Sequence, residues 1–236
     1  MQYLGGKSRI AKQIISMMSA EREESMPWVE PFMGSGKVIS KVHGRRIGAD
    51  VNHEMIALFK AIQDGWEPPT EVSEEFYYQV RDNQDDYPDH LKGFISIGCS
   101  FGGKRWGGFA RNKRGDNYAH QSSQALIGLR LLLESVELYA CDYQDLNIPP
   151  SSLIYCDPPY QDTVGYGFNF NHEEFYLWCR SKVEEGHYIF VSEYDMPDDF
   201  EEIWSFDTLV SLNGVDRKIE RLFRLHRKPA FSLKRY

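Results

Sequence analysis

The spacing of hydrophobic residues in the first part of the chain predicts both helices and strands. From about Ser8, apolar residues three and four positions apart mark one face of a helix. Two runs, Trp28 to Phe32 and Arg45 to Asp50, are typical of short buried strands. The apolar positions from Met55 to Ile62 predict a second helix, which ends at Gly65.

The second half of the chain shows the same mixture. Apolar positions from Ala125 to Val136 predict a helix. A further helix begins at Asn171, with Glu174 three residues on in a capping-box arrangement, and ends at Gly186. Strands are predicted at Val136–Cys141, Leu153–Asp157, His187–Tyr194 and Leu222–Leu225. Alternating strands and helices are typical of a doubly wound α/β sheet.

Regular periodicity fails between Trp66 and His120. Paired prolines, acidic residues, aromatic residues and glycines dominate this stretch. A bare loop of this length is uncommon in a compact domain. We therefore expect residues 66–120 to form a small inserted lobe, and residues 1–65 and 121–236 to form the main domain.

The composition excludes several classes of protein. The chain has 236 residues, of which 42% are hydrophobic, enough for one large core or for a core with an inserted lobe. No apolar run approaches the roughly 20 residues that span a bilayer, and no apolar signal segment follows Met1. The four cysteines form no C-x-x-C pair, which argues against a zinc site and a disulfide scaffold. We expect a cytoplasmic protein with reduced thiols, no membrane segment and no metal.

The net charge of −8 disfavours nucleic-acid binding, but one segment has the opposite sign. The segment from Phe101 to Gly115, here called the basic loop, reads FGGKRWGGFARNKRG and contains no acidic residue. Its cations are Lys104, Arg105, Arg111, Lys113 and Arg114. Phosphate binding depends on local potential, so the basic loop is a candidate nucleic-acid contact, with Trp106 and Phe109 available to stack on bases. The alternative interpretation is a solvated charged loop.

A glycine-containing loop follows the first predicted strand. This glycine loop, Glu30 to Gly36, reads EPFMGSG, and Asp50 lies 20 residues beyond Glu30 at the end of the next predicted strand. In nucleotide-binding α/β folds, such glycines let a ligand approach the backbone, and an acid at this offset accepts hydrogen bonds from ribose hydroxyls. A tight turn without a ligand is the alternative. The motif is not a P-loop, because Val38 stands where Ser or Thr would hold magnesium.

The sequence Asp157-Pro158-Pro159-Tyr160 follows a predicted buried strand directly. The two prolines lack backbone N–H groups and fix their own φ angles, so the strand ends in a rigid turn. This turn presents the Asp157 carboxylate and the Pro158 carbonyl as neighbouring acceptors, with the Tyr160 ring beside them. Two acceptors suit the two hydrogens of a planar amino group, and the ring suits the face of a base. The turn is therefore the candidate catalytic site.

Four motifs in this order resemble one family. YLGGK at Tyr3 to Lys7, the glycine loop, the acid in GADVN and the Asp-Pro-Pro-Tyr turn resemble the Dam-type DNA adenine-N6 methyltransferases of bacteria and phages. The resemblance implies a Rossmann-like methyltransferase sheet and S-adenosylmethionine as methyl donor. It also implies donor contacts at Tyr3, Lys7, Asp50, Asp142 and Asp157, and a wall for the methionine end from Glu30, Phe32, Gly34 and Gly36. For Asp142, a solvated residue at a strand end is the alternative.

The resemblance further implies what the remaining parts do. The lobe becomes a target-recognition region for double-stranded DNA, from which an adenine is flipped out. Its amino group then donates hydrogen bonds to Asp157 and Pro158 while Tyr160 stacks on the base. The host is expected to be a bacterial or phage-infected cell, and the oligomeric state stays open. Because Asp-Pro-Pro-Tyr also occurs in methyltransferases of RNA and of protein amides, such an enzyme is one alternative. A non-catalytic DNA-binding relative is the other.

Overall fold

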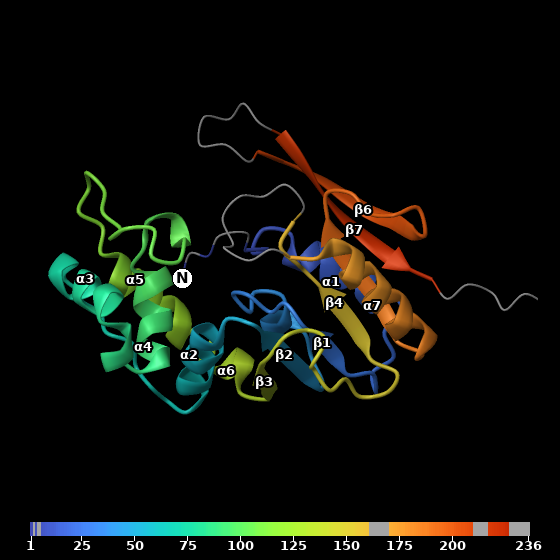
Figure 1. The fold of residues 1–236 in the computed structure, drawn as a ribbon, viewed down its shortest axis with the longest axis horizontal. Helices are drawn as coiled ribbons and strands as arrows, with labels where there is room; N and C mark the ends of the chain where they lie inside the picture. The colour runs from blue at the N-terminus through green and yellow to red at the C-terminus, as the bar shows by residue number, and fades with distance from the viewer. Residues whose placement is uncertain (2, 4–5, 161–169, 210–216, 227–236) are drawn as a thin grey trace, which may run out of the picture. The chain divides into compact units, whose positions relative to one another are not determined.

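The computed structural model describes residues 1, 3, 6–160, 170–209 and 217–226 (Figure 1). Within these residues, seven strands form one sheet in the order β3-β2-β1-β4-β5-β7-β6. Strand β4 pairs in parallel with β1 and β5, and β2 pairs in parallel with β3, whereas β7 is antiparallel to β5 and β6. The predicted α/β class is confirmed. No helix in the described part of the chain is long and apolar enough to cross a membrane.

The chain packs as two compact units. The first comprises Met1–Ile15 and Glu30–Asn147, and the second comprises Ser16–Val29 and the chain from Ile148 onward. Helix α1 (Ala11–Ser19) and strand β1 (Trp28–Glu30) each contribute residues to both units. The predicted lobe at residues 66–120 lies inside the first unit, and its separate role stays a prediction.

Strands β2 (Arg46–Asp50) and β3 (Val136–Ala140) of the first unit end at the same edge, with Asp50 paired opposite Ala140. Helix α2 (His53–Gln63) follows β2 at once. Its first turn is capped by the Asn52 side chain, which accepts the N–H of Met55 at 3.2 Å. Helix α2 therefore begins beside the carboxyl ends of the two strands.

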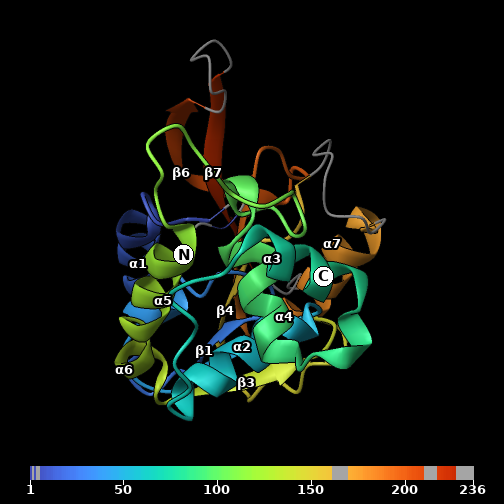
Figure 2. The ribbon, with the colours of Figure 1, turned by 90° about the vertical axis from the view of Figure 1, so that its left-hand side faces the viewer.

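The stretch from 66 to 120 contains several short helices, which its sequence pattern does not reveal. They are α3 (Glu74–Asp82), α4 (Asp89–Gly93), a π-helical segment (Phe94–Gly98) and the start of α5 (Tyr118–Ile127). Two 3₁₀ turns lie in the same stretch, at Gln84–Asp86 and Phe101–Gly103. A third 3₁₀ turn lies earlier in the chain, at Ile39–Lys41. Helix α4 lies beside α2 (Figures 1 and 2). Gly93 permits this approach, because a Cβ there would lie 2.4 Å from the Glu54 carbonyl oxygen.

The single helix predicted from Ala125 to Val136 is wrong. Helix α5 ends at Ile127, α6 (Arg130–Leu133) is a separate short helix, and β3 begins at Val136. Gly128, a residue type with poor helix propensity, directly follows α5. The predicted apolar positions Leu126, Leu129, Leu133 and Val136 are buried, so the spacing does mark a buried face, which two short helices and the start of β3 share.

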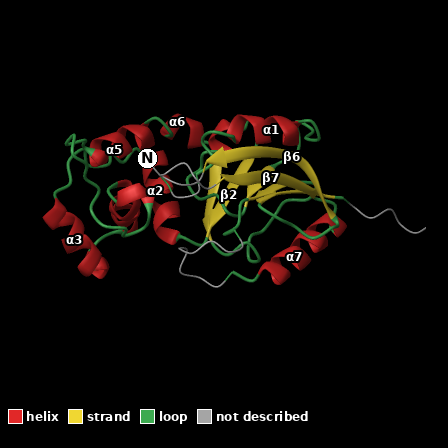
Figure 3. Ribbon diagram, turned by 90° about the horizontal axis from the view of Figure 1, so that it is seen from above, coloured by secondary structure: helices red, strands yellow, loops and turns green. Residues whose placement is uncertain are grey.

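The second unit is built on β4 (Leu153–Cys156), β5 (Tyr188–Glu193), β6 (Phe200–Leu209) and β7 (Arg217–Leu225). Helix α7 (His172–Glu184) packs against β5 and β7 (Figure 3). Its predicted start is confirmed, because the Asn171 side chain accepts the N–H of Glu174 at 3.3 Å. Its predicted stop at Gly186 is also confirmed, since this residue follows the helix with φ +95°.

Three strand predictions needed correction. Strand β1 stops at Glu30 rather than Phe32, since Pro31 has no N–H to donate to the sheet. Strand β7 is longer than the predicted Leu222–Leu225, and β6 was not predicted. Both form an antiparallel ribbon in which many side chains are charged, as is common at sheet edges, and this masks the apolar alternation.

Candidate active site

The glycine loop of the first unit is closed by a carboxylate from the next strand. Gly34 and Gly36 both have positive φ angles, +49° and +66°, which favour glycine. The N–H of Gly34 donates a hydrogen bond to Asp50 Oδ2 at 2.8 Å. A Cβ at Gly34 would lie 3.4 Å from the Tyr3 ring, so glycine also lets that ring lie close to the loop. The structure therefore brings Tyr3, the loop and Asp50 together.

Asp50 is held at the end of β2 and stays partly exposed. Its second oxygen, Oδ1, accepts the N–H of Asn52 at 2.9 Å. Burial raises the pKa of Asp50, and the hydrogen bonds from Asn52 and Gly34 oppose that rise. Each carboxylate oxygen has capacity for a second hydrogen bond, so this carboxylate can also accept from a ligand hydroxyl.

Asp142 lies just beyond the neighbouring strand, two residues after the Ala140 that pairs with Asp50. Its side chain is exposed and accepts the N–H of Gln144 at 3.0 Å through Oδ1. The next residue, Tyr143, is buried, and its ring centroid lies 5.2 Å from that of Phe32 in the glycine loop. The predicted residues Phe32, Asp50 and Asp142 thus gather at the carboxyl ends of the strands, where α/β sheets bind ligands.

The two remaining predicted charges of this unit are buried. Glu30 is 2% exposed at the end of β1, and Lys7 is 7% exposed just before α1. Burying a charge is costly unless the surroundings compensate it. Both side chains therefore face the interior and not solvent, so Lys7 is not an ordinary surface lysine.

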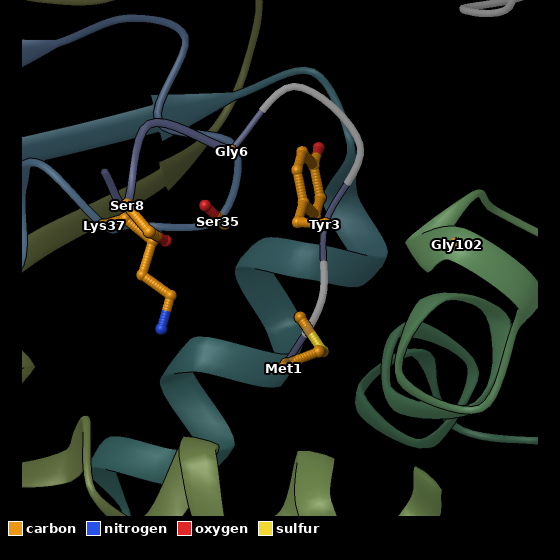
Figure 4. Close-up of a pocket in the computed structure, with 7 residues that line it drawn as sticks. All are labelled: Met1, Tyr3, Gly6, Ser8, Ser35, Lys37 and Gly102. Atoms are coloured by element: carbon orange, nitrogen blue, oxygen red, sulfur yellow. The ribbon is translucent and has the colours of Figure 1, made fainter. Parts of the chain in front are cut away.

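A cavity of about 340 Å³ lies between the N-terminal segment and the glycine loop (Figure 4). Its lining residues are Met1, Tyr3, Gly6, Ser8, Ser35, Lys37 and Gly102. Figure 4 shows Met1 and Tyr3 on one side and Ser8, Ser35 and Lys37 on the other. Burial, and secondarily the Lys41 cation, lowers the pKa of Lys37. Sequence reasoning missed Ser35 and Lys37, although both belong to the rejected P-loop look-alike.

In the second unit, the Asp-Pro-Pro-Tyr turn begins where the fully buried strand β4 ends. Asp157 and Pro159 are partly exposed, and Pro158 is buried. The Tyr160 hydroxyl donates to Glu220 Oε2 on β7 at 2.7 Å. The Tyr160 ring also meets the Tyr194 ring edge to face, with a centroid distance of 4.6 Å. The sequence analysis gave Glu220 no role, and it lies 60 residues from Tyr160 along the chain.

The phenol of Tyr160 is strongly biased toward its protonated form. Burial is the main cause, and the Asp157 and Glu220 carboxylates add to it, so the pKa of Tyr160 lies well above its usual value. The hydroxyl therefore remains a hydrogen-bond donor throughout the neutral pH range. The residues that follow the turn, 161–169, lie outside the described part of the chain.

Two cations of the basic loop pair with acidic residues that lie outside the loop. Arg105 donates to both carboxylate oxygens of Glu54 on α2, at 3.1 and 2.9 Å. Arg111 Nη1 lies 3.0 Å from Glu74 Oε2 on α3. Both acids belong to distant parts of the sequence, so inspection of the loop alone could not reveal them.

The aromatic residue predicted to contact DNA points inward. Trp106 has a positive φ of +50°, and its ring centroid lies 5.5 Å from that of Tyr77 on α3. Phe109 packs on the same tyrosine at 5.8 Å. The indole N–H of Trp106 is buried and lacks a hydrogen-bond partner in the described residues. Trp106 and Phe109 therefore anchor the loop to α3 instead of projecting from it.

The remaining cations of the loop, Lys104, Lys113 and Arg114, are exposed. In the described part of the chain, none of them forms an ion pair with an acid. These three side chains keep the local positive potential that the sequence indicates. Elsewhere, no group of three or more His, Cys, Asp or Glu side chains among the described residues could hold a metal ion.

Substitution Arg105→Gln is expected to lower the free energy of unfolding by about 1–2 kcal/mol, because it leaves the buried Glu54 carboxylate without its cation. The effect stays below that of a fully buried pair, since the Arg105 side chain is 46% exposed. Chemical denaturation measures it, with the exposed neighbour Lys104→Gln as the matched control. Equal stability of the two variants would contradict this role for Arg105.

Comparison with known families agrees with these motifs. A family model described as D12 class N6 adenine-specific DNA methyltransferase matches residues 3–214. The chain belongs to this family. Members of the D12 class are S-adenosylmethionine-dependent enzymes, so the predicted resemblance, enzyme class and methyl donor are confirmed. No curated protein matches the chain.

Solved structures similar to this D12 class chain share little sequence with it. SMU.472, solved in complex with SAH, is 15% identical with a TM-score of 0.38; the match covers 94% of this chain and 53% of that one. HI0767 from Haemophilus influenzae is 12% identical with a TM-score of 0.37, covering 93% and 89%. An RNA methyltransferase from Salinibacter ruber in complex with S-adenosyl-L-homocysteine is 11% identical with a TM-score of 0.37, covering 95% and 97%. This chain thus spans about half the length of SMU.472.

Proposed function

We propose that the protein transfers the methyl group of S-adenosylmethionine to N6 of adenine at specific sites in double-stranded DNA. The observation that carries this proposal is the Asp-Pro-Pro-Tyr turn, which follows the buried strand β4 in a chain of the D12 class. From the family resemblance, we place this activity in the cytoplasm of a bacterium or a phage-infected host.

The residues of the first unit fit a nucleoside-containing methyl donor. Asp50 retains acceptor capacity for ribose hydroxyls after its hydrogen bonds to Gly34 and Asn52. Asp142, beside the Tyr143–Phe32 ring pair, offers a carboxylate and aromatic surface to the donor's adenine. The volume of about 340 Å³ for the adjoining cavity lies within the usual range of small-molecule sites.

We assign the binding of the methionine end of S-adenosylmethionine to the residues around the N-terminal segment. Tyr3 lies close to the loop at Gly34, and Lys7 and Glu30 are buried charges in the same unit. Gly36, with its positive φ, lets the loop turn tightly over the core, where a Cβ would lie 3.0 Å from Met33 Cε. When bound, S-adenosylmethionine supplies a methyl group on a positively charged sulfur, which makes that carbon electrophilic.

The turn in the second unit supplies acceptors for the adenine amino group. The Asp157 carboxylate accepts one N–H, and the Pro158 carbonyl accepts the other. Holding both hydrogens in this way draws the nitrogen lone pair out of conjugation with the ring and makes it available for attack. Asp157 can then receive the proton that the methylated nitrogen releases. Pro159 stiffens the turn, and the Tyr160 ring packs on the base.

We assign DNA binding to the three exposed cations of the basic loop, Lys104, Lys113 and Arg114, and to Phe101. Phe101 is 62% exposed, whereas Trp106 and Phe109 are packed on Tyr77. The strand-like bridge between Ser100 and Phe109, with a hydrogen bond from the Phe101 N–H to the Gly108 carbonyl at 2.9 Å, fixes the loop base. An exposed ring on this fixed backbone, three residues before Lys104, suits stacking at a base step that opens when a base is flipped out.

Transfer of a labelled methyl group tests this function. Purified protein and labelled S-adenosylmethionine are incubated separately with duplex DNA, with RNA of the same sequence and with a protein extract. We expect label in the duplex DNA alone, and sequencing of the modified DNA then gives the recognised site. Label confined to RNA or protein would support a methyltransferase of another substrate class, and DNA binding without transfer would support a non-catalytic relative.

A further inference from the structure

The Tyr160 ring is held from two neighbouring strands of the second unit. Glu220 on β7 accepts its hydroxyl at 2.7 Å, and Tyr194, just after β5, meets the ring edge to face. Strands β5 and β7 pair directly, with Glu193 opposite Arg221. The contacts to the hydroxyl and to the ring therefore come from adjacent parts of one sheet.

Tyr194 is itself fixed through its backbone. Its N–H donates to Oε1 of the buried Glu193 at 2.8 Å, and its carbonyl oxygen accepts a hydrogen bond from Arg221. Arg221 also pairs with Glu202 Oε2 on β6 at 3.0 Å. The surface against which Tyr160 packs is thus tied to all three strands β5, β6 and β7.

A hydroxyl bound to a carboxylate restrains an aromatic ring more firmly than packing alone. Hydrogen bonds to a charged acceptor are roughly twice as strong as neutral ones, and the acceptor fixes the position of the para end of the ring. The edge-to-face contact restrains the ring plane. Together they define where the face of Tyr160 lies relative to Asp157 in the same rigid turn.

We infer that Glu220 is a positioning residue, whose hydrogen bond to Tyr160 orients that ring for the target base beside Asp157. This inference rests on the proposed function, because it assigns to Tyr160 a base to pack on. Glu220 acts through Tyr160. Its loss should therefore affect the rate at which the bound base reacts rather than the affinity for the methyl donor.

Four variants test the inference: Tyr160→Phe, Glu220→Ala, Glu220→Gln and the double variant Tyr160→Phe with Glu220→Ala. Each of the first two is expected to lower kcat about tenfold, the effect of one lost hydrogen bond to a charged group. The double variant should be no slower than either single one, since both remove the same hydrogen bond. Glu220→Gln keeps an acceptor and should stay within about threefold of the wild type. KM for S-adenosylmethionine should not change.

Glu201→Gln is the matched control, because it alters an exposed carboxylate on the same ribbon that pairs with Arg224 instead. Wild-type kcat in Glu220→Ala, or additive losses in the double variant, would overturn the positioning role while leaving the proposed function intact. An equal loss in Glu220→Gln and Glu220→Ala would also overturn it. A wild-type protein that transfers no methyl group to DNA would overturn both proposals. Chemical denaturation of the same variants gives their free energies of unfolding. From these, the double-mutant cycle yields the coupling energy between Tyr160 and Glu220.

Discussion

Replacing Asp157 by alanine is expected to reduce methyl transfer to DNA at least about 1,000-fold at saturating donor and DNA. In the proposed function, the carboxylate accepts a hydrogen bond from the adenine amino group and also receives the released proton. Alanine removes both contributions. Asp157→Asn keeps an oxygen acceptor but cannot take the proton, so its loss should be smaller.

Single-turnover rates with both ligands bound measure the effect without interference from binding losses. The matched control is Asp198→Asn, an exposed carboxylate beyond β5 in the same unit. It should transfer methyl at the wild-type rate. Activity of Asp157→Ala within tenfold of the wild type would remove Asp157 from the reaction.

The second large effect concerns the exposed cations of the basic loop. Replacing Lys104, Lys113 and Arg114 together by glutamine is expected to weaken DNA binding about 100-fold at low salt. It should also reduce the slope of log K against log salt by roughly 2.7, about 0.9 for each phosphate contact. The effect should be similar for specific and non-specific DNA, because phosphates carry no sequence information.

Binding titrations across a salt series measure this slope. Exchanging the exposed Lys12 and Lys60 for glutamine gives a control with cations outside the basic loop, and Arg105→Gln tests a loop cation that is already paired with Glu54. Neither should change the slope appreciably. An unchanged slope in the triple variant would exclude the basic loop from the DNA interface.

Local signals predicted much of the fold. A run of buried residues that ends in a glycine, a proline or a carboxylate identifies both a strand and the point where it stops. Asp50 and Asp157 were therefore predicted correctly to lie at strand ends. The predicted cap at Asn171 is equally local, since its side chain accepts the N–H of Glu174 three residues on. The edge strand β6 was missed because adjacent glutamates and a register shift between Glu202 and Trp204 interrupt its apolar alternation.

Partners far apart in sequence could not be predicted. Arg105 and Glu54 are 51 residues apart, and Tyr160 and Glu220 are 60 apart, so neither pair leaves a spacing signal. The same limit made Trp106 look available for DNA, because nothing beside it in the sequence shows that Tyr77 covers its ring. Composition identified the basic loop, but tertiary packing decides which of its side chains face outward.

The central claim is that the methyl group ends on the exocyclic nitrogen of adenine in DNA. Unmodified plasmid DNA incubated with the purified protein and S-adenosylmethionine, digested to nucleosides and analysed by mass spectrometry, tests it most directly. N6-methyldeoxyadenosine should appear with the wild type and be absent with Asp157→Ala. N4-methyldeoxycytidine in its place, or unmodified DNA from a folded protein that binds the donor, would contradict the claim.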